Sequence, residues 1–390
     1  MKKIKVAFFA DILIEDFDGA SRTMFQIIRR IPALRFEFLF ICGVGPERLF
    51  GFDCVRLPSL SLPLNNTYKM ALPAFAQTRL REELEKFSPD IVHIATPSLL
   101  GQFALKYARK WQVPVLSIYH THFVSYIDYY LKHLPFAIPF VKDLVKVAQN
   151  GFYNQCDKVY IPSESIAGEL VAGGVKPDCI KIWKRGVDTN LFSPRERDVK
   201  WMRNLCGNDY PTILFASRLV WEKNLETLIA VYRLMRKSDH QFNLVVAGDG
   251  VAAEACRMRM PGAVFLGKAD HPTLARLYAS SDVFLFTSVS ETYGNVVAEA
   301  MASGLPCVIA DGGGSADFVT EGITGFKCRP FDSSSYVDKI RLLLEDKALA
   351  AAIAGNSVAY ARNLDWNRLT DIYFSDLEAL ALPDLSVRFA

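Results

Sequence analysis

Residues 290–304 read SETYGNVVAEAMASG, and a short, largely apolar run lies on each side of them, at residues 282–286 and 307–310. Runs of four or five such residues are typical of strands buried in a parallel sheet. Between the two runs the pattern predicts a loop and then a helix that begins near Asn295 and ends before Gly304. The loop would thus lie at the carboxyl end of a strand, which is where open parallel sheets bind ligands.

Two glutamates in this stretch, eight residues apart, indicate a binding site. Glu291 falls on the loop, where its carboxylate can accept hydrogen bonds from sugar hydroxyls, and Glu299 falls about one turn into the helix, where it can reach back toward the sheet edge. The first N–H groups of a helix have no partner within it, and together with the helix dipole they favour an anion such as a nucleotide phosphate. On this pattern alone, an ordinary strand and helix with a solvated glutamate at each end is the alternative.

Length and composition describe a globular protein of two domains. A chain of 390 residues exceeds the size at which a single core stops growing, and a content of 51% hydrophobic and 22% charged residues excludes disorder. The eight cysteines form no C-x-x-C pair, so we expect reduced core residues of a cytosolic protein. The N-terminal apolar run ends at Asp11, which predicts a buried strand rather than a signal peptide. No stretch approaches the roughly 18 apolar residues of a membrane span, so a soluble protein is expected.

Apolar runs alternate with helical patterns along the chain, which predicts an α/β fold of βαβ units with parallel sheets. The runs expected as strands, besides the two above, are residues 6–10, 36–41, 90–94, 113–119, 159–162, 180–183, 212–216, 244–247 and 264–268. The helical patterns are residues 21–31, 78–87, 99–111, 139–152, 225–235 and 366–382. Residues 195–210 are polar and are the expected linker between the two domains.

Two features of the first half are candidates for a binding site. Gly19 lies on the loop 11–20, where a glycine lets the backbone approach a ligand closely, although a glycine that only serves the turn fits equally well. His120 and His122 follow the strand 113–119 and point the same way on an extended chain, as two metal ligands would. Local spacing suggests no third ligand, so we favour an active-site histidine over a metal ligand or a packed histidine.

Arg218 and Lys223 lie on the loop between the strand 212–216 and the helix 225–235. A guanidinium offers a planar fork for phosphate oxygens, and a lysine ammonium is a compact point charge. Together they can neutralise the two phosphates of a leaving nucleotide, which is the electrostatic task of a nucleotide-dependent transferase. A solvated basic loop is the alternative.

Taken in order, these motifs resemble the large family of retaining glycosyltransferases with two facing Rossmann-like domains, the GT-B enzymes of glycosyltransferase family 4. The resemblance covers essentially the whole chain. It rests on the first-loop glycine, Tyr-His-Thr at 119–121, Gly-Val-Asp at 186–188, the R-x-x-x-x-K spacing of 218–223, Gly-Asp-Gly at 248–250 and the two glutamates. Arg185 replaces the asparagine usual before Gly-Val-Asp, as in branches resembling bacterial GDP-mannose-dependent α-mannosyltransferases and lipid sulfoquinovosyl or glucosyl transferases.

This resemblance implies a donor cleft between an N-terminal acceptor domain, residues 1–194, and a C-terminal nucleotide-sugar donor domain, residues 211–365. A C-terminal helix within residues 366–390 would cross back to the first domain. Catalytic roles are implied for His120, Arg218, Lys223 and Glu291. The donor-binding residues it implies are Gly19, Arg218, Lys223, Gly248, Lys268, Glu291, Thr292, Tyr293, Gly294, Asn295, Val296 and Glu299. No metal and no cofactor is expected beside the nucleotide sugar.

The expected reaction is transfer of a hexose with retention, from GDP-mannose in the first place and from UDP-glucose or another UDP-hexose in the second. Outside this reaction, the alternatives are a sugar-nucleotide epimerase of the same two-domain plan and a two-domain sugar-binding protein without catalysis.

The acceptor is expected to be a lipid, a lipid-linked sugar or a glycan. Residues 1–190 carry 24 Lys and Arg against 18 Asp and Glu, a basic surplus that is too small to indicate nucleic acid. With the aromatic, lysine-bearing segment 123–153, it suits an acceptor at an anionic membrane. We therefore expect the protein in the cytoplasm or peripherally at the inner face of the cytoplasmic membrane. An ordinary amphipathic core helix is the alternative for this segment.

Overall fold

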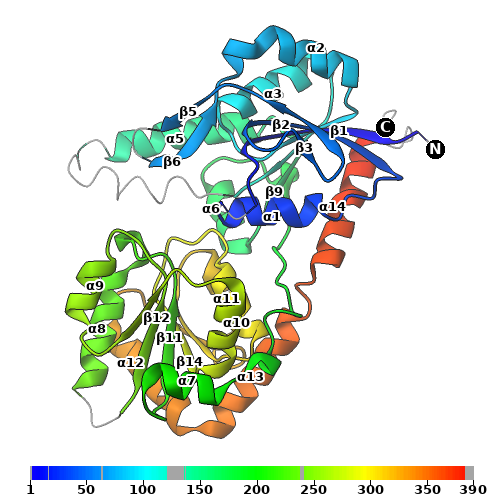
Figure 1. Cartoon of the computed structure of the whole chain (residues 1–390). Coiled ribbons are helices and arrows are strands. Elements are labelled where there is room, and N and C mark those ends of the chain that lie inside the picture. The colour runs from blue at the N-terminus through cyan, green and yellow to red at the C-terminus, as the bar shows by residue number, and fades with distance from the viewer. Residues whose placement is uncertain are drawn as a thin grey trace. The chain divides into compact units, whose positions relative to one another are not determined.

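The computed structural model describes residues 2–15, 17–62, 65–120, 136, 138–237 and 241–382. It divides into two compact units (Figure 1), one formed by Met1–Lys184 with Asn367–Ala390 and the other by Arg185–Trp366. Both units are built on mainly parallel sheets with helices on their faces, as the alternating pattern predicts.

The division between the units falls at Lys184 and Arg185, earlier than the expected end of the first domain at residue 194. Residues 195–210, which we expected to be a linker, lie in the second unit. They include the helix α7 (Val199–Cys206), whose Met202 is buried in the core of that unit. This short helix also packs Trp201, Leu205 and Cys206 against that core, and its apolar residues were overlooked among the polar ones of the segment.

The first unit holds an eight-stranded sheet in the order β10-β9-β8-β7-β1-β2-β4-β3, parallel throughout except for β3 against β4. Its strands are β1 (Ile4–Ile12), β2 (Phe36–Val44), β3 (Arg48–Leu49), β4 (Phe52–Arg56), β7 (Ile91–Ile94), β8 (Val115–Ile118), β9 (Lys158–Ile161) and β10 (Ile180–Ile182). A separate hairpin is formed by β5 (Ser59–Leu62) and β6 (Asn65–Ala71). The six apolar runs expected as strands in this half are confirmed, whereas β3 to β6, which mix polar and apolar residues, were not predicted.

Helices cover both faces of this sheet, which explains why its central strands are apolar on both sides. The helices α2 (Gln77–Phe87), α3 (Leu99–Trp111), α6 (Glu164–Ala172) and the end of α5 (Ile138–Tyr153) share one core with the strands. The opposite side carries an aromatic cluster that includes residues of the C-terminal helix α14 (Trp366–Ala381). The helix α1 (Gly19–Ile28) follows β1 and is capped by Asp18.

A buried carboxylate joins α14 to the strands β9 and β10. Asp376 accepts hydrogen bonds from Lys158 Nζ at 2.9 Å, from Lys181 Nζ at 2.6 Å and from the Tyr160 hydroxyl. Burial alone would raise the pKa of Asp376, but these three donors outweigh it and hold the pKa below its ordinary value. The C-terminal helix is therefore part of the first unit through specific charged contacts as well as apolar packing.

His93 on β7 gives this packing a pH dependence. Its Nδ1 lies 2.8 Å from the Tyr373 hydroxyl, its ring stacks on Phe8, and complete burial lowers its pKa to about 3. The unfolded chain binds a proton at this histidine below about pH 6.5, whereas the folded chain does not until the pH approaches 3. The free energy of unfolding should therefore be unaffected by His93 above pH 6.5 and fall by up to ~1.4 kcal/mol per pH unit below it.

Urea unfolding between pH 7.5 and pH 4.5 tests this prediction. His93→Gln removes the titrating ring and should flatten the slope, whereas Tyr373→Phe removes the hydrogen bond but should keep the slope. Equal slopes in wild type and His93→Gln would contradict the role of His93.

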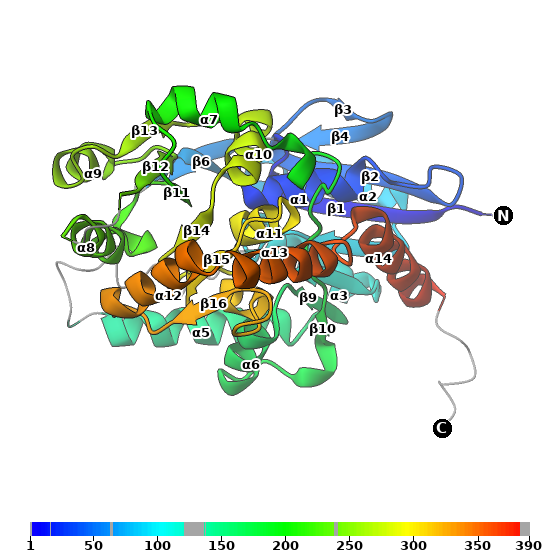
Figure 2. The same cartoon turned by 90° about the horizontal axis from the view of Figure 1, so that it is seen from below.

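The second unit holds six parallel strands in the order β13-β12-β11-β14-β15-β16, which follow one another across Figure 2. They are β11 (Thr212–Ala216), β12 (Asn243–Ala247), β13 (Val264–Gly267), β14 (Val283–Phe286), β15 (Cys307–Ala310) and β16 (Phe326–Cys328). One face packs against α8 (Leu225–Arg236), α9 (Ala253–Arg259) and α12 (Ser333–Glu345), and the other against α7, α10 (His271–Ser280) and α11 (Asn295–Ala302). The helix α13 (Lys347–Ala361) follows α12. In the described part of the chain, every helix is too short or too polar to cross a membrane.

Candidate active site

Two loops leave the carboxyl edge of the second unit's sheet side by side. The strands β11 and β14 are neighbours, but the chain continues from β11 to β12 on one side and from β14 to β15 on the other. The loops that follow them, residues 217–224 and 287–294, therefore separate at a crossover point, which is where α/β sheets bind ligands. The structure thus brings the loop of Arg218 and Lys223 together with the loop of Glu291.

Buried hydrogen bonds join the two loops. The Thr287 hydroxyl lies 3.2 Å from the carbonyl oxygen of Lys223 and 3.1 Å from that of Asn224, and the Asn224 amide donates to the Thr287 carbonyl at 3.2 Å. Ser290 Oγ donates to the Glu222 carbonyl at 3.1 Å. These contacts fix the backbone of both loops, so the side chains that they carry are held in a defined arrangement.

An ion pair connects the loops at the centre of this network. Lys223 Nζ lies 2.6 Å from Glu291 Oε1, and the side chains are 4% and 21% exposed respectively. Because an unpaired buried ammonium is costly, Glu291 stabilises a positive charge that would otherwise be unfavourable at this position. The glutamate remains exposed enough for a ligand to reach it.

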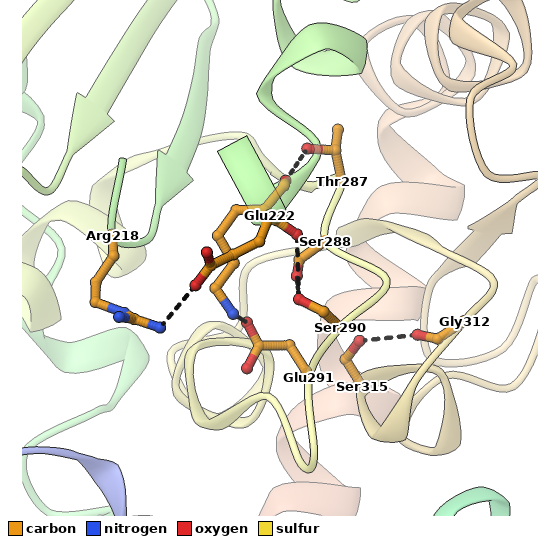
Figure 3. A network of polar contacts seen from close by, with 9 residues as sticks. Arg218, Glu222, Thr287, Ser288, Ser290, Glu291, Gly312 and Ser315 are labelled. Carbon is orange, nitrogen blue, oxygen red and sulfur yellow. Dashed lines mark hydrogen bonds and ion pairs between the residues drawn. The ribbon is translucent and has the colours of Figure 1, made fainter. Parts of the chain in front are cut away.

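A second ion pair lies beside the first (Figure 3). Arg218 Nη2 is 3.5 Å from Glu222 Oε1, with the arginine side chain 64% exposed and the glutamate side chain only 9% exposed. Glu222 was not among the residues predicted from the sequence, although its place four residues after Arg218 and directly before Lys223 was a usable signal. The two loops of the candidate site therefore carry two cations, Arg218 and Lys223, and two carboxylates, Glu222 and Glu291.

The helix α11 begins at Asn295, as predicted, and follows Gly294, which adopts a left-handed φ of 85°. No side chain caps this helix, and Asn295 Oδ1 is buried without a partner among the described residues. The glycine-rich loop after β15 supports the backbone of the loop 287–294, which leads into α11, because the Gly314 N–H donates to the Glu291 carbonyl at 2.7 Å. The helix N-terminus thus opens at the same sheet edge as Lys223 and Glu291.

Other residues of this stretch are more buried than expected for ligand contacts. The Tyr293 hydroxyl donates to the Arg185 carbonyl at 2.5 Å, and its ring packs edge-on against Phe318. Glu299 is 8% exposed and accepts a hydrogen bond from the Tyr278 hydroxyl at 3.2 Å. Thr292 is buried and Val296 half-buried. Tyr293 therefore fixes the loop 287–294 to the interior of the second unit.

Gly248 and Lys268 follow β12 and β13 at the same edge of the sheet. The Gly248 N–H donates to the Gly267 carbonyl at 2.7 Å, and Lys268 is exposed. A Cβ atom on Gly248 would lie 1.8 Å from the Ser217 carbonyl oxygen, so the glycine is needed for close packing of the two loops. Whether it also contacts a ligand stays a prediction.

The remaining candidates belong to the first unit. Gly19, which we placed on a loop, is the first residue of α1, and its carbonyl accepts a hydrogen bond from the Thr23 hydroxyl at 2.9 Å. His120 is buried and follows β8 at the carboxyl edge of its sheet. His122 and residues 123–135 lie outside the described residues. Among the residues that are described, no group of three or more His, Cys, Asp and Glu side chains could hold a metal ion.

Comparison with known proteins gives matches to both halves of the chain. Residues 17–191 match the family model described as Glycosyltransferase Family 4, and residues 202–358 match the one described as Glycosyl transferases group 1. The chain is 31% identical over 329 residues to a GDP-mannose-dependent alpha-mannosyltransferase of Mycobacterium tuberculosis, with 83% of each chain covered. It is 32% identical to a sulfoquinovosyl transferase of Arabidopsis thaliana, covering 83% of this chain and 63% of that one.

Solved structures resemble the fold of the whole chain. Sucrose-phosphate synthase from Thermosynechococcus elongatus superposes with a TM-score of 0.78 at 20% identity, covering 97% of this chain and 99% of that chain. Anabaena HepE in complex with UDP-glucose superposes with a TM-score of 0.72 at 19% identity, covering 96% of this chain and 100% of that chain.

Proposed function

The chain belongs to the family 4 glycosyltransferases and has the GT-B fold, and from this premise we propose that it transfers mannose from GDP-mannose, with retention, to a hydroxyl group of a lipid, lipid-linked sugar or glycan. The observation that carries the proposed site is the Lys223–Glu291 ion pair at the crossover point of the second unit's sheet. The likeness to GDP-mannose-dependent alpha-mannosyltransferases supports the choice of donor.

In the proposed site, two cations bind the donor diphosphate. Arg218 is exposed and offers a planar fork to phosphate oxygens, and the buried Lys223 contributes a charge whose position is fixed. The uncapped N-terminus of α11 adds N–H donors and the positive end of its dipole. Glu291 accepts hydrogen bonds from hydroxyl groups of the sugar while it keeps Lys223 in place.

The chain's residues then stabilise the leaving group. The bond between the anomeric carbon and the phosphate oxygen breaks, and its electron pair leaves with the diphosphate, whose charge Arg218 and Lys223 neutralise. The acceptor hydroxyl gives its proton to the departing phosphate oxygen and attacks the sugar on the same face, which retains the configuration. His120 orients the sugar or the acceptor. Because two side-chain cations and helix amides meet the diphosphate, we propose that neither a metal nor a cofactor is needed.

A UDP-hexose is the second candidate donor. Two relatives are named for a sugar other than mannose, alpha-monoglucosyldiacylglycerol synthase and sulfoquinovosyl transferase, and these names support transfer of another hexose. Calorimetry and nucleotide-release assays on the purified protein with EDTA, using GDP-mannose, UDP-glucose, UDP-galactose and UDP-GlcNAc, decide between them. Micromolar binding and slow release of GDP with GDP-mannose alone would support the proposal. Turnover of a UDP-sugar instead would identify a UDP-hexose as the donor, and binding of none of the four would contradict the proposed site.

A lipid or lipid-linked acceptor is supported by an exposed apolar face on the helix α5. Phe136, just before the helix, and Phe140, Leu144 and Val147 on it follow helical spacing, and their exposed fractions lie between 59% and 81%. An apolar row on a surface helix is typical of elements that lie in a membrane interface. We propose that this row contacts the membrane in which the acceptor resides.

Sedimentation with anionic vesicles tests this contact. The double substitution Phe140→Ser and Leu144→Ser should reduce the fraction of protein bound by about tenfold. Each removed side chain gives up at most roughly 1.5–3 kcal/mol of the free energy of burial in the membrane interface. Phe75→Ser removes an equally exposed aromatic ring elsewhere in the first unit and should leave binding unchanged. Equal binding of both variants would exclude α5 as the contact.

A further inference from the structure

Two cysteines of the first unit form a close pair of thiols. Cys42 on β2 and Cys54 on β4 place their sulfur atoms 3.4 Å apart. Cys42 is completely buried, whereas Cys54 is partly exposed. The two neighbouring strands are parallel, with Cys54 opposite Phe40, so the pair is diagonal and both side chains lie on the same face of the sheet.

The exposed member of this pair opens onto a positively charged surface. An open depression of about 370 Å³ is lined by Cys54, Arg56, Arg79 and Glu47, and Arg56 forms an ion pair with Glu47. Arginine side chains next to a partly exposed thiol favour the thiolate, which is the reactive form of cysteine. Cys54 therefore combines access from solvent with an environment that supports its negative charge.

The two thiols differ in acidity. The hydrogen bond from Cys42 lowers the pKa of Cys54, burial opposes this, and the charge of Arg56 lowers it further. The same hydrogen bond and its own burial raise the pKa of Cys42. Cys206 offers a comparison, since it is also partly exposed but burial raises its pKa. Cys54 is therefore the more acidic thiol of the pair, and Cys42 is the neighbour whose hydrogen bond stabilises the Cys54 thiolate when it forms.

We propose that Cys54 and Cys42 form an oxidation site for hydroperoxides, with Cys54 as the thiol that attacks the peroxide and Cys42 as the thiol that resolves the resulting sulfenic acid. The Cys54 thiolate takes the terminal oxygen of the hydroperoxide, the O–O bond breaks, and the remaining alcohol or water leaves after protonation. Cys42 then displaces the hydroxyl of the Cys54 sulfenic acid as water, and a disulfide forms. The peroxide is reduced by two electrons, and the two thiols lose two electrons and two protons.

The place of the pair in the sheet makes such a bond reversible. Closing the bond must shorten the separation of the two sulfur atoms from 3.4 Å to about 2.0 Å across the paired strands β2 and β4, which strains that pairing. Disulfides that distort their surroundings are more readily reduced than relaxed ones. We therefore expect millimolar thiol to restore both cysteines.

Peptide mapping of the full-length protein tests the proposal independently of any transferase activity. Reduced protein is treated with a few equivalents of hydrogen peroxide, alkylated and digested. The expected result is a linked Cys42–Cys54 peptide lighter by two hydrogens, with Cys206 still fully alkylated as the matched control within the chain. Oxidation of Cys206 at the same rate, or a Cys54 thiol that survives the treatment, would overturn the proposal.

Three variants assign the two roles. Cys54→Ser changes a surface residue and should leave Cys42 unoxidised, because the buried thiol has no reactive neighbour. Cys42→Ser should leave Cys54 as a sulfenic acid that dimedone traps, while wild type gives no adduct. Arg56→Gln removes a nearby charge and should slow disulfide formation several-fold. Oxidation of Cys42 in Cys54→Ser, or an unchanged rate in Arg56→Gln, would refute the assigned chemistry.

Discussion

Replacing Lys223 with alanine should lower kcat/KM for the nucleotide-sugar donor by roughly 30-fold to 1,000-fold, as expected when one preorganised donor of about 2–4 kcal/mol is lost from a developing negative charge. The lysine is 4% exposed and lies 2.6 Å from Glu291, so its position is fixed before any ligand arrives. A fixed charge needs no reorganisation during the reaction, which is why its removal should affect kcat as well as KM.

The matched control is Lys339→Ala in the helix α12. Lys339 also pairs with a glutamate, at 3.1 Å from Glu321, but lies away from the crossover point. It should keep wild-type kcat/KM, because partly exposed ion pairs contribute little. Thermal unfolding of both variants separates a loss of folding from a loss of catalysis. A Lys223→Ala enzyme that folds and keeps its kcat/KM would rule out the proposed role of Lys223.

The sequence predicts that both loops lie at the carboxyl edge of a parallel sheet, because the positions and direction of the strands suffice for that. The runs 212–216 and 282–286 correspond to β11 and β14, and parallel strands bring their following loops to one edge. What the sequence does not contain is that these two strands are neighbours. That follows from the packing of whole helices on the sheet, which places β12 and β15 on opposite sides of them.

The contacts that the site residues make with their neighbours could not be predicted from the sequence either. Glu222 looks like a surface residue in the pattern, yet its side chain is only 9% exposed, and its backbone carbonyl accepts a hydrogen bond from the Ser290 hydroxyl of the second loop. Tyr293 looks like a ligand contact, yet its hydroxyl is bonded to the carbonyl of Arg185, more than a hundred residues away in the chain. Such contacts depend on tertiary packing, on which residue patterns carry little information.

The glycine-rich loop after β15 shows how closely the backbone behind Glu291 is packed. Gly313 has φ of 63° and ψ of −177°, a region of backbone conformation that is almost exclusive to glycine. A Cβ atom there would lie 2.8 Å from the carbonyl oxygen of Val289 and 2.9 Å from that of Glu291. These two carbonyl groups belong to the loop 287–294 and can give way only if that whole loop shifts. The same loop carries Glu291, one half of the Lys223–Glu291 pair.

We therefore expect Gly313→Ala to lower the free energy of unfolding by about 2–4 kcal/mol, through backbone strain and overpacking together. It should also weaken nucleotide-sugar binding at least tenfold, because Glu291 moves away from Lys223. Gly322→Ala separates the two causes: Gly322 has a similar φ of 69°, but no atom lies within 4 Å of the added Cβ. This control should show only the strain, about 1 kcal/mol, with normal binding. Equal donor affinity in Gly313→Ala and Gly322→Ala, measured by calorimetry, would mean that the loop behind Glu291 does not position it.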